Sequence, residues 1–137
     1  MLKTLTAAGL GLALIAGPTA AQNPTGAAIV AAQLDAASNE MGLTPGARVS
    51  GRLAQGARQM VNLQAPGGTT YFIGVCDENC RDLDLIVRDA SGRELDRDEA
   101  VDDVPVVAVQ TRAGTYTVEV SMADCTGQCH WGVGVFR

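Results

Sequence analysis

From Leu43 onward, short runs of alternating apolar and polar residues follow one another, and this period-two pattern is the strongest constraint on the fold. Glycine, proline, asparagine or aspartate separates successive runs, and these residues favour turns. A period of two directs one set of side chains into a core and the other into water, as in a β-strand. The predicted strands are Ala47–Leu53, Arg58–Gln64, Thr70–Cys76, Leu83–Asp89, Glu94–Asp96, Val104–Thr111, Thr115–Met122 and Trp131–Phe136. About eight strands at this spacing predict an all-β domain, either a β-sandwich or a small barrel.

The alternation is clear in the fourth of these runs. Leu83, Leu85 and Val87 share one face. Asp84 and Arg88 lie on the other face. A slip of one residue would turn every apolar side chain of the strand into water, so the pattern fixes which face is buried. We therefore expect Leu85 in the core and a solvated face at Arg88.

The first 21 residues have the layout of a secretory signal peptide. Lys3 gives a positive start, and Leu5–Gly17 is an apolar run without charge. Thr19 and Ala21 are small residues that suit a cut before Gln22. The apolar run is too short to cross about 30 Å of hydrocarbon, which takes ~20 residues. The sequence therefore predicts export to the periplasm or out of the cell, with no membrane span once the signal is removed.

Between the signal and the strands, residues 22–44 are predicted to be a leader that contains one helix. The helix covers Ala27–Met41, which lacks internal Gly and Pro. Thr25 can cap its start and Gly42 can end it. Its partial apolar face consists of Ile29, Ala32, Leu34 and Ala36 or Ala37. Because the segment is only weakly amphipathic, we expect a surface helix or a tether that lies loosely on the β-sandwich domain, residues 45–137.

Four cysteines form two C-x-x-x-C units, Cys76 with Cys80 and Cys125 with Cys129. Export favours disulfides, and zinc sites prefer a C-x-x-C spacing, so we predict two disulfide bonds rather than a metal. Three pairings are open. A bridge across some fifty residues stabilises by about 4 kcal/mol, and a five-residue loop by roughly 2. Turn-forming residues inside both units favour the local pairing, 76–80 and 125–129.

Three segments together suggest a family. They are Cys76-Asp-Glu-Asn-Cys80-Arg-Asp-Leu-Asp-Leu-Ile-Val-Arg-Asp89, Asp102-Asp103-Val104-Pro105-Val106-Val107 and Gly114-Thr-Tyr-Thr-Val-Glu-Val120. Their order resembles the bacterial pre-peptidase C-terminal domain and its small stand-alone exported relatives, over about Ala47–Arg137. The resemblance implies a jelly-roll-like β-sandwich that is non-catalytic in most members, and some relatives bind collagen or calcium. The two cysteine pairs depart from that pattern.

Acidic residues are concentrated in Asp77–Asp103, which holds eleven Asp or Glu against four Arg, while the whole chain has a net charge of −5. Grouped carboxylates are the ligands that calcium requires. The candidate ligands are Asp82, Asp84, Asp102 and Asp103. The alternative is a solvated acidic surface with turn-forming aspartates, because no EF-hand motif is present.

Several functions are disfavoured by the sequence. The acidic balance argues against a nucleic-acid partner, which needs a basic surface. There is no Gly-x-Ser-x-Gly, P-loop, Rossmann or zinc-protease motif. His130, the single histidine, is expected to be a polar residue beside a disulfide, and Trp131, Tyr71 and Tyr116 are expected in the core rather than stacked on a sugar.

The sequence thus predicts an exported, non-catalytic β-sandwich module that binds a protein or polymer at the cell envelope. The alternative is a calcium-stabilised structural domain of a surface assembly, and calcium is the one candidate cofactor. A small hydrolase is disfavoured because no catalytic constellation is found.

Overall fold

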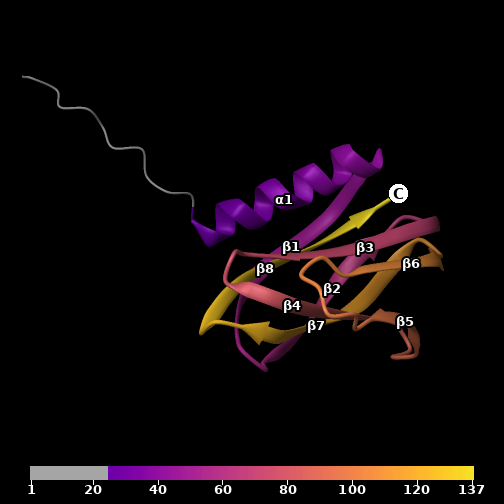
Figure 1. Ribbon diagram of the computed structural model, residues 1–137. Coiled ribbons are helices and arrows are strands. Elements are labelled where there is room, and N and C mark those ends of the chain that lie inside the picture. Colours follow the sequence, from indigo (N-terminus) through magenta and orange to yellow (C-terminus); the bar gives the residue numbers. More distant parts are fainter. Residues whose placement is uncertain (1–24) are drawn as a thin grey trace, which may run out of the picture.

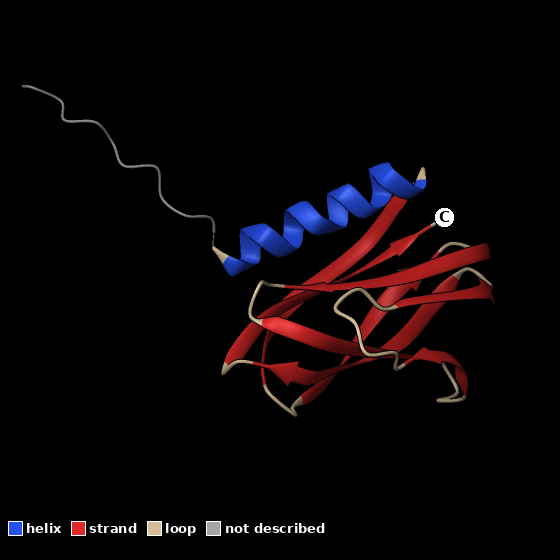
Figure 2. Cartoon of the chain, in the orientation of Figure 1, coloured by secondary structure: helices blue, strands red, loops and turns tan. Residues whose placement is uncertain are grey.

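The computed structural model describes residues 25–137 as two packed four-stranded sheets with one helix (Figures 1 and 2). The predicted signal peptide and its cut before Gln22 lie outside the described residues. The elements are α1 (Gly26–Met41), β1 (Pro45–Ala54), β2 (Arg58–Ala65), β3 (Gly68–Cys76), β4 (Cys80–Arg88), β5 (Glu94–Asp98), β6 (Val106–Thr111), β7 (Gly114–Cys125) and β8 (Gln128–Phe136).

Both sheets are antiparallel, and together they form the predicted β-sandwich. One has the strand order β1-β8-β3-β6 and is called here the helix-covered sheet, because α1 lies on its outer face (Figure 1). The other, with the order β2-β7-β4-β5, is called the open sheet. All eight predicted strands are present, and β4 and β7 are longer than predicted because they run on to Cys80 and Cys125, which lie opposite each other.

The core lies between the sheets and follows the predicted parity. Leu83, Leu85 and Val87 of β4 are fully buried there, beside Phe72 and Trp131 of the helix-covered sheet. Burying one such side chain stabilises the fold by roughly 1.5–3 kcal/mol. Of the aromatic residues expected in the core, Trp131 is fully buried and Tyr116 is buried there. Tyr71 is only partly buried and packs instead in the cluster between α1 and the helix-covered sheet.

Two disulfide bonds join the sheets at one end of the sandwich. They connect Cys76 to Cys80 and Cys125 to Cys129, with Cα–Cα distances of 5.9 and 6.2 Å. These are the local pairs that the turn residues favoured. Each bond nevertheless crosses between layers, because β3 and β8 belong to the helix-covered sheet while β4 and β7 belong to the open sheet.

The helix does not lie loosely, and this expectation was wrong. Val30 and Leu34 are buried against the outer face of β8. Leu34 belongs to the predicted apolar face, whereas Val30 was not predicted there. The contact depends on glycines, since a Cβ at Gly132 would lie 2.4 Å from Cγ1 of Val30. Gly132 and Gly134 lie two residues apart on β8 and leave its outer face without side chains at both positions. A weakly amphipathic helix can therefore pack closely on this face. The expected caps are present at Thr25 and Gly42.

Tyr116, in the segment Gly114-Thr-Tyr116 at the start of β7, closes the turn from β6 to β7. The phenol oxygen of Tyr116 accepts a hydrogen bond from the backbone N–H of Arg112 and donates one to its carbonyl, both at 2.9 Å. Such a tyrosine corner fixes the strand crossing in many β-sandwiches. The motif that carried the family resemblance therefore has a structural role at this position.

Candidate functional site

The loop between β5 and β6, residues 99–105, is attached to both sheets. On the open sheet, the N–H of Leu83 donates to the carbonyl of Asp102 at 3.0 Å. On the helix-covered sheet, the N–H of Gly74 donates to the carbonyl of Pro105 at 2.9 Å. The loop is therefore fixed at two points along one edge of the sandwich.

Two aspartate side chains fix the loop further. Asp98 accepts from the N–H of Ala100 at 3.1 Å and from the N–H of Val106 at 2.9 Å. Asp102 accepts from the N–H of Val104 at 2.9 Å. These bonds replace the backbone partners that an irregular segment lacks. The predicted calcium ligand Asp102 thus has one carboxylate oxygen engaged in its own turn.

This fixed loop holds apolar side chains in water. Val101 is 87% exposed and Val104 is 45% exposed. Both are flanked by carboxylates, and Asp103 beside Val104 is exposed. An apolar side chain that a rigid backbone holds in solvent loses little entropy when a partner covers it, so it is suited to binding.

Asp82 and Asp84 project from β4 beside this loop and are half-buried. One oxygen of each carboxyl group, Oδ1, is buried without a hydrogen-bond partner in residues 25–137. The pKa of Asp84 is raised to about 6, first by burial and then by the negative charges of Asp82, Glu99 and Asp98. The negative charge here is therefore concentrated and poorly neutralised.

The arginines near this region pair mainly with acids outside it, and Glu99 is the one member of the region that has an arginine partner in residues 25–137. Arg81 contacts Asp124 at 2.9 Å, and Arg97 contacts Glu94 and also Glu99 at 2.7 Å. None of the arginines in the described residues forms an ion pair with Asp82, Asp84, Asp98, Asp102 or Asp103. We call this region the acidic edge, and it comprises Asp82, Asp84, Asp98, Glu99, Asp102 and Asp103 with Val101 and Val104.

The acidic edge brings the predicted metal ligands to one side of the sandwich, but it does not gather them around one point. Within residues 25–137, no three His, Cys, Asp or Glu side chains converge in a way that could hold a metal ion. Asp82 and Asp84 lie together on β4, whereas Asp102 and Asp103 lie on the loop.

Arg88 was expected to project into water, but its side chain forms an ion pair with a buried glutamate. Arg88 lies 3.0 Å from Glu119, whose side chain is only 8% exposed, and Arg58 approaches the same carboxylate at 3.5 Å. The prediction failed because strand parity tells which face a residue occupies but not which charge a neighbouring strand places beside it. Glu119 lies on β7 and pairs diagonally with Arg88 across the open sheet.

Sequence reasoning missed a second buried carboxylate, Asp77. Its Oδ2 accepts from the N–H of His130 at 2.8 Å and lies 3.2 Å from Nδ1 of the same residue. The His130 ring also packs under α1, where a Cβ at Gly26 would lie 2.2 Å from Nδ1. The pair fixes the turn beside the disulfides and the start of the helix. Among the described residues, no hydroxyl or thiol is hydrogen-bonded to His130, so the pair does not form a hydrolase triad.

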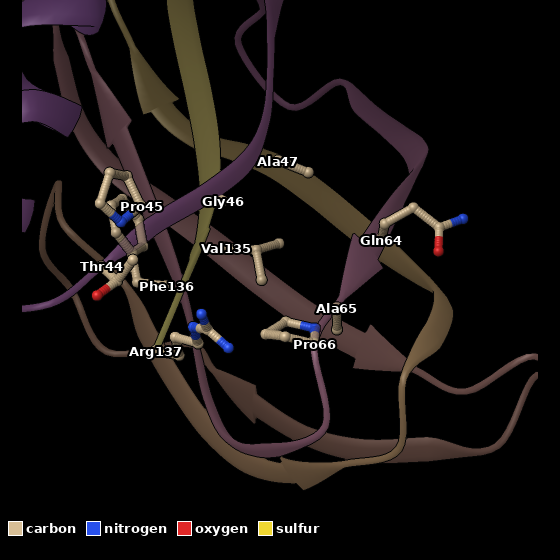
Figure 3. Close-up of a pocket in the computed structure, with 10 residues that line it drawn as sticks. All are labelled: Thr44, Pro45, Gly46, Ala47, Gln64, Ala65, Pro66, Val135, Phe136 and Arg137. Atoms are coloured by element: carbon tan, nitrogen blue, oxygen red, sulfur yellow. The ribbon is translucent and has the colours of Figure 1, made fainter.

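An open apolar cleft of about 390 Å³ lies where β1 and β2 diverge (Figure 3). Pro45, Ala47, Pro66 and Val135 line it, and the guanidinium of Arg137 points toward Pro66. The polar side chains that line this cleft are those of Thr44, Gln64 and Arg137. In the part of the chain that the structure describes, no helix is long and apolar enough to cross a membrane.

The fold of residues 25–137 is a β-sandwich similar to that of the pre-peptidase C-terminal domain. The pre-peptidase C-terminal domain of a collagenase from Bacillus anthracis matches with a TM-score of 0.51 at 14% identity, over 65% of this chain and 87% of that one. PliG from Aeromonas hydrophila, a periplasmic inhibitor of g-type lysozyme, matches with a TM-score of 0.44 at 16% identity, over 71% and 90%. No protein-family model and no curated protein matches the sequence.

Proposed function

We propose that this chain is an exported, non-catalytic β-sandwich that binds a protein, with the acidic edge as its contact surface. The observation that carries the proposal is the loop of residues 99–105, which displays Val101 and Val104 beside Asp102 and Asp103, two carboxylates that form no ion pair with an arginine in residues 25–137. The expected partner presents a small apolar surface surrounded by lysines or arginines.

Rigidity and charge both favour such a contact. A loop already fixed to both sheets loses little conformational freedom on binding. A cationic side chain placed beside Asp84 would relieve the repulsion that raises the pKa of this group to about 6. Binding should then release a proton near that pH and should weaken as salt screens the charges.

Export is part of the same proposal. The signal layout of the first 21 residues and the two disulfide bonds both suit an oxidising compartment. All four cysteines are at least 95% buried, which suits structural rather than redox-active bonds.

Site-specific photo-crosslinking in the producing cell tests the proposal. A photoreactive residue at Val101 should yield a discrete adduct with a basic protein, and adding Asp103→Asn should reduce the yield. Met60 is the matched control, because it is 64% exposed but lies on β2, the far edge of the open sheet. Equal adducts from both positions, or none from Val101, would contradict a binding role for the acidic edge.

Calcium is the alternative occupant of this region, as in a calcium-stabilised structural domain. The unpartnered oxygens of Asp82 and Asp84 are the observation in its favour. Melting in calcium and in sodium at matched ionic strength separates the two. A saturable rise in Tm that Asp82→Asn/Asp84→Asn abolishes would replace the protein partner by calcium as the first ligand of the acidic edge.

A further inference from the structure

The end of the sandwich opposite the disulfides carries two exposed arginines, Arg93 and Arg112. Two turns meet there, residues 89–93 between β4 and β5 and residues 112–113 between β6 and β7 (Figure 1). A hollow of about 470 Å³ and a second of about 310 Å³ are lined by residues of both turns. Arg112, Asp89 and Tyr116 line both hollows, and Arg93 lines the larger one. We call this region the arginine end.

We propose that the arginine end binds an oxyanion, a carboxylate or phosphate group of a ligand, between Arg93 and Arg112. This site is separate from the acidic edge and does not depend on the function proposed for it.

Arg112 is positioned but not paired. Its backbone N–H and carbonyl are both bonded to the phenol of Tyr116, so the turn that carries it is fixed. Its side chain is exposed and forms no hydrogen bond or ion pair within residues 25–137. A guanidinium on a fixed backbone suits the two-pronged recognition of a carboxylate or phosphate.

The one carboxylate that lines the hollows is largely occupied by its own turn. Oδ1 of Asp89 accepts from the N–H of Ser91 at 2.9 Å, from its hydroxyl at 2.6 Å and from the N–H of Arg93 at 3.1 Å. These bonds, led by that from the Ser91 hydroxyl, lower the pKa of Asp89. Its contact with the Arg93 side chain is looser, at 3.4 Å, and Arg93 remains 76% exposed. Arg93 can therefore turn to a ligand while Asp89 keeps the turn closed.

The second hollow adds a neutral donor. Oγ1 of Thr115 accepts a hydrogen bond from the amide of Gln64, which leaves its own O–H free to donate. Two guanidinium groups and a hydroxyl thus face the same end of the molecule, on a chain whose net charge is −5. An anionic ligand would be repelled by the acidic edge and attracted here.

Two-dimensional NMR titration tests the site with stated probes, inorganic phosphate and citrate, at constant ionic strength. The amide signals of Gly92, Arg93, Arg112 and Ala113 should shift and saturate with at least one probe. The probe that saturates at the lower concentration identifies phosphate or carboxylate as the preferred group. Arg112→Gln should weaken binding about tenfold.

Arg52→Gln is the matched control, since Arg52 is an equally exposed arginine on β1 that lies outside both hollows. It removes the same charge and should leave the titration unchanged. Equal weakening by Arg52→Gln and Arg112→Gln would mean that the anions respond only to the overall field. Shifts that never saturate would likewise overturn the site.

Discussion

At the acidic edge, five of the six carboxylates form no ion pair with an arginine in the described residues, whereas at the arginine end Arg112 is unpaired, Arg93 has one loose ion pair and the nearby acid is engaged in a turn. Asp98 and Asp89 have the same structural role in the two regions, because each accepts hydrogen bonds from two backbone N–H groups and so holds a turn. The difference lies in the neighbours. Asp98 adds its charge to Asp82, Asp84 and Glu99, while Asp89 faces Arg93.

This comparison shows that an acid's position in the sequence does not determine whether it is neutralised. Arg81 and Arg88 lie within the acidic stretch Asp77–Asp103 but pair outside it, with Asp124 and Glu119. Arg93 and Arg97 pair inside the stretch, with Asp89 and with Glu94 and Glu99, respectively. Two of these partners come from β7, the neighbouring strand of the open sheet. The charge left at the acidic edge is therefore a result of strand pairing.

The largest expected effect tests whether Asp98 holds the loop. Asp98→Ala removes two charge-assisted bonds, to Ala100 and Val106, and should lower the free energy of unfolding by about 2 kcal/mol. Urea unfolding followed by the fluorescence of Trp131, the single and fully buried tryptophan, measures it. Asp103→Ala, which removes an exposed acid of the same loop, is the control and should change little. Equal effects of the two changes would mean that the loop is not held by Asp98.

A smaller effect tests the arginine end. Tyr116→Phe keeps the ring in the core but removes both hydrogen bonds to Arg112, and it should cost about 1 kcal/mol. The same urea series measures it. If the turn at Arg112 is fixed by this phenol, amide hydrogen exchange at Arg112 and Ala113 should also become faster in the variant. Unchanged exchange would show that the turn is held by other contacts.

The next prediction concerns pH and the raised pKa of Asp84. The pKa is about 6 in the folded chain, against an ordinary value of 3.8, so between these two pH values the folded state binds more protons than the unfolded state. The free energy of unfolding therefore falls as pH rises through this window. Asp84→Asn should remove that fall and stabilise the protein at pH 7 by about 1 kcal/mol, less than the full shift implies because the group is partly exposed.

Measuring Tm from pH 3.5 to 7 for wild type and Asp84→Asn isolates this group. Glu94 and Asp124 have lowered pKa values because Arg97 and Arg81 bond to them, so the stabilisation that they contribute is lost as pH falls through and below their ordinary pKa values, and this loss is shared by both proteins. Parallel curves for the two proteins would contradict crowding at the acidic edge.

Much of the fold could be predicted from the sequence, because strand parity and turn residues are local signals. Leu85 is buried as its alternation requires, and the caps at Thr25 and Gly42 are present. The docking of α1 was missed, since it depends on Gly132 and Gly134 of β8, far away in the sequence. The spacing of two residues between these glycines is the signal in the sequence that could have indicated the docking surface.

The candidate sites were only partly predictable for the same reason. The crowding of acids is visible in the sequence, and Asp82, Asp84, Asp102 and Asp103 do lie along one edge. Which of them bonds to backbone, and which keeps a free oxygen, depends on the path of the loop between two sheets. The pairing of Asp77 with His130 joins residues 53 positions apart and had no local signal.

The smallest expected effect concerns the contribution of the Arg112 side chain to the free energy of unfolding. Arg112→Gln should change the free energy of unfolding by no more than about 0.5 kcal/mol, because the exposed guanidinium has no partner in residues 25–137 and the bonds to Tyr116 use only backbone atoms. Arg88→Gln is the contrasting change, since it weakens the neutralisation of the buried Glu119 and should cost more, about 1–3 kcal/mol. Urea unfolding of both variants under one condition provides the measurement. A cost for Arg112→Gln that equals that of Arg88→Gln would assign the arginine to the stability of the fold. A negligible cost would leave its side chain free for a ligand.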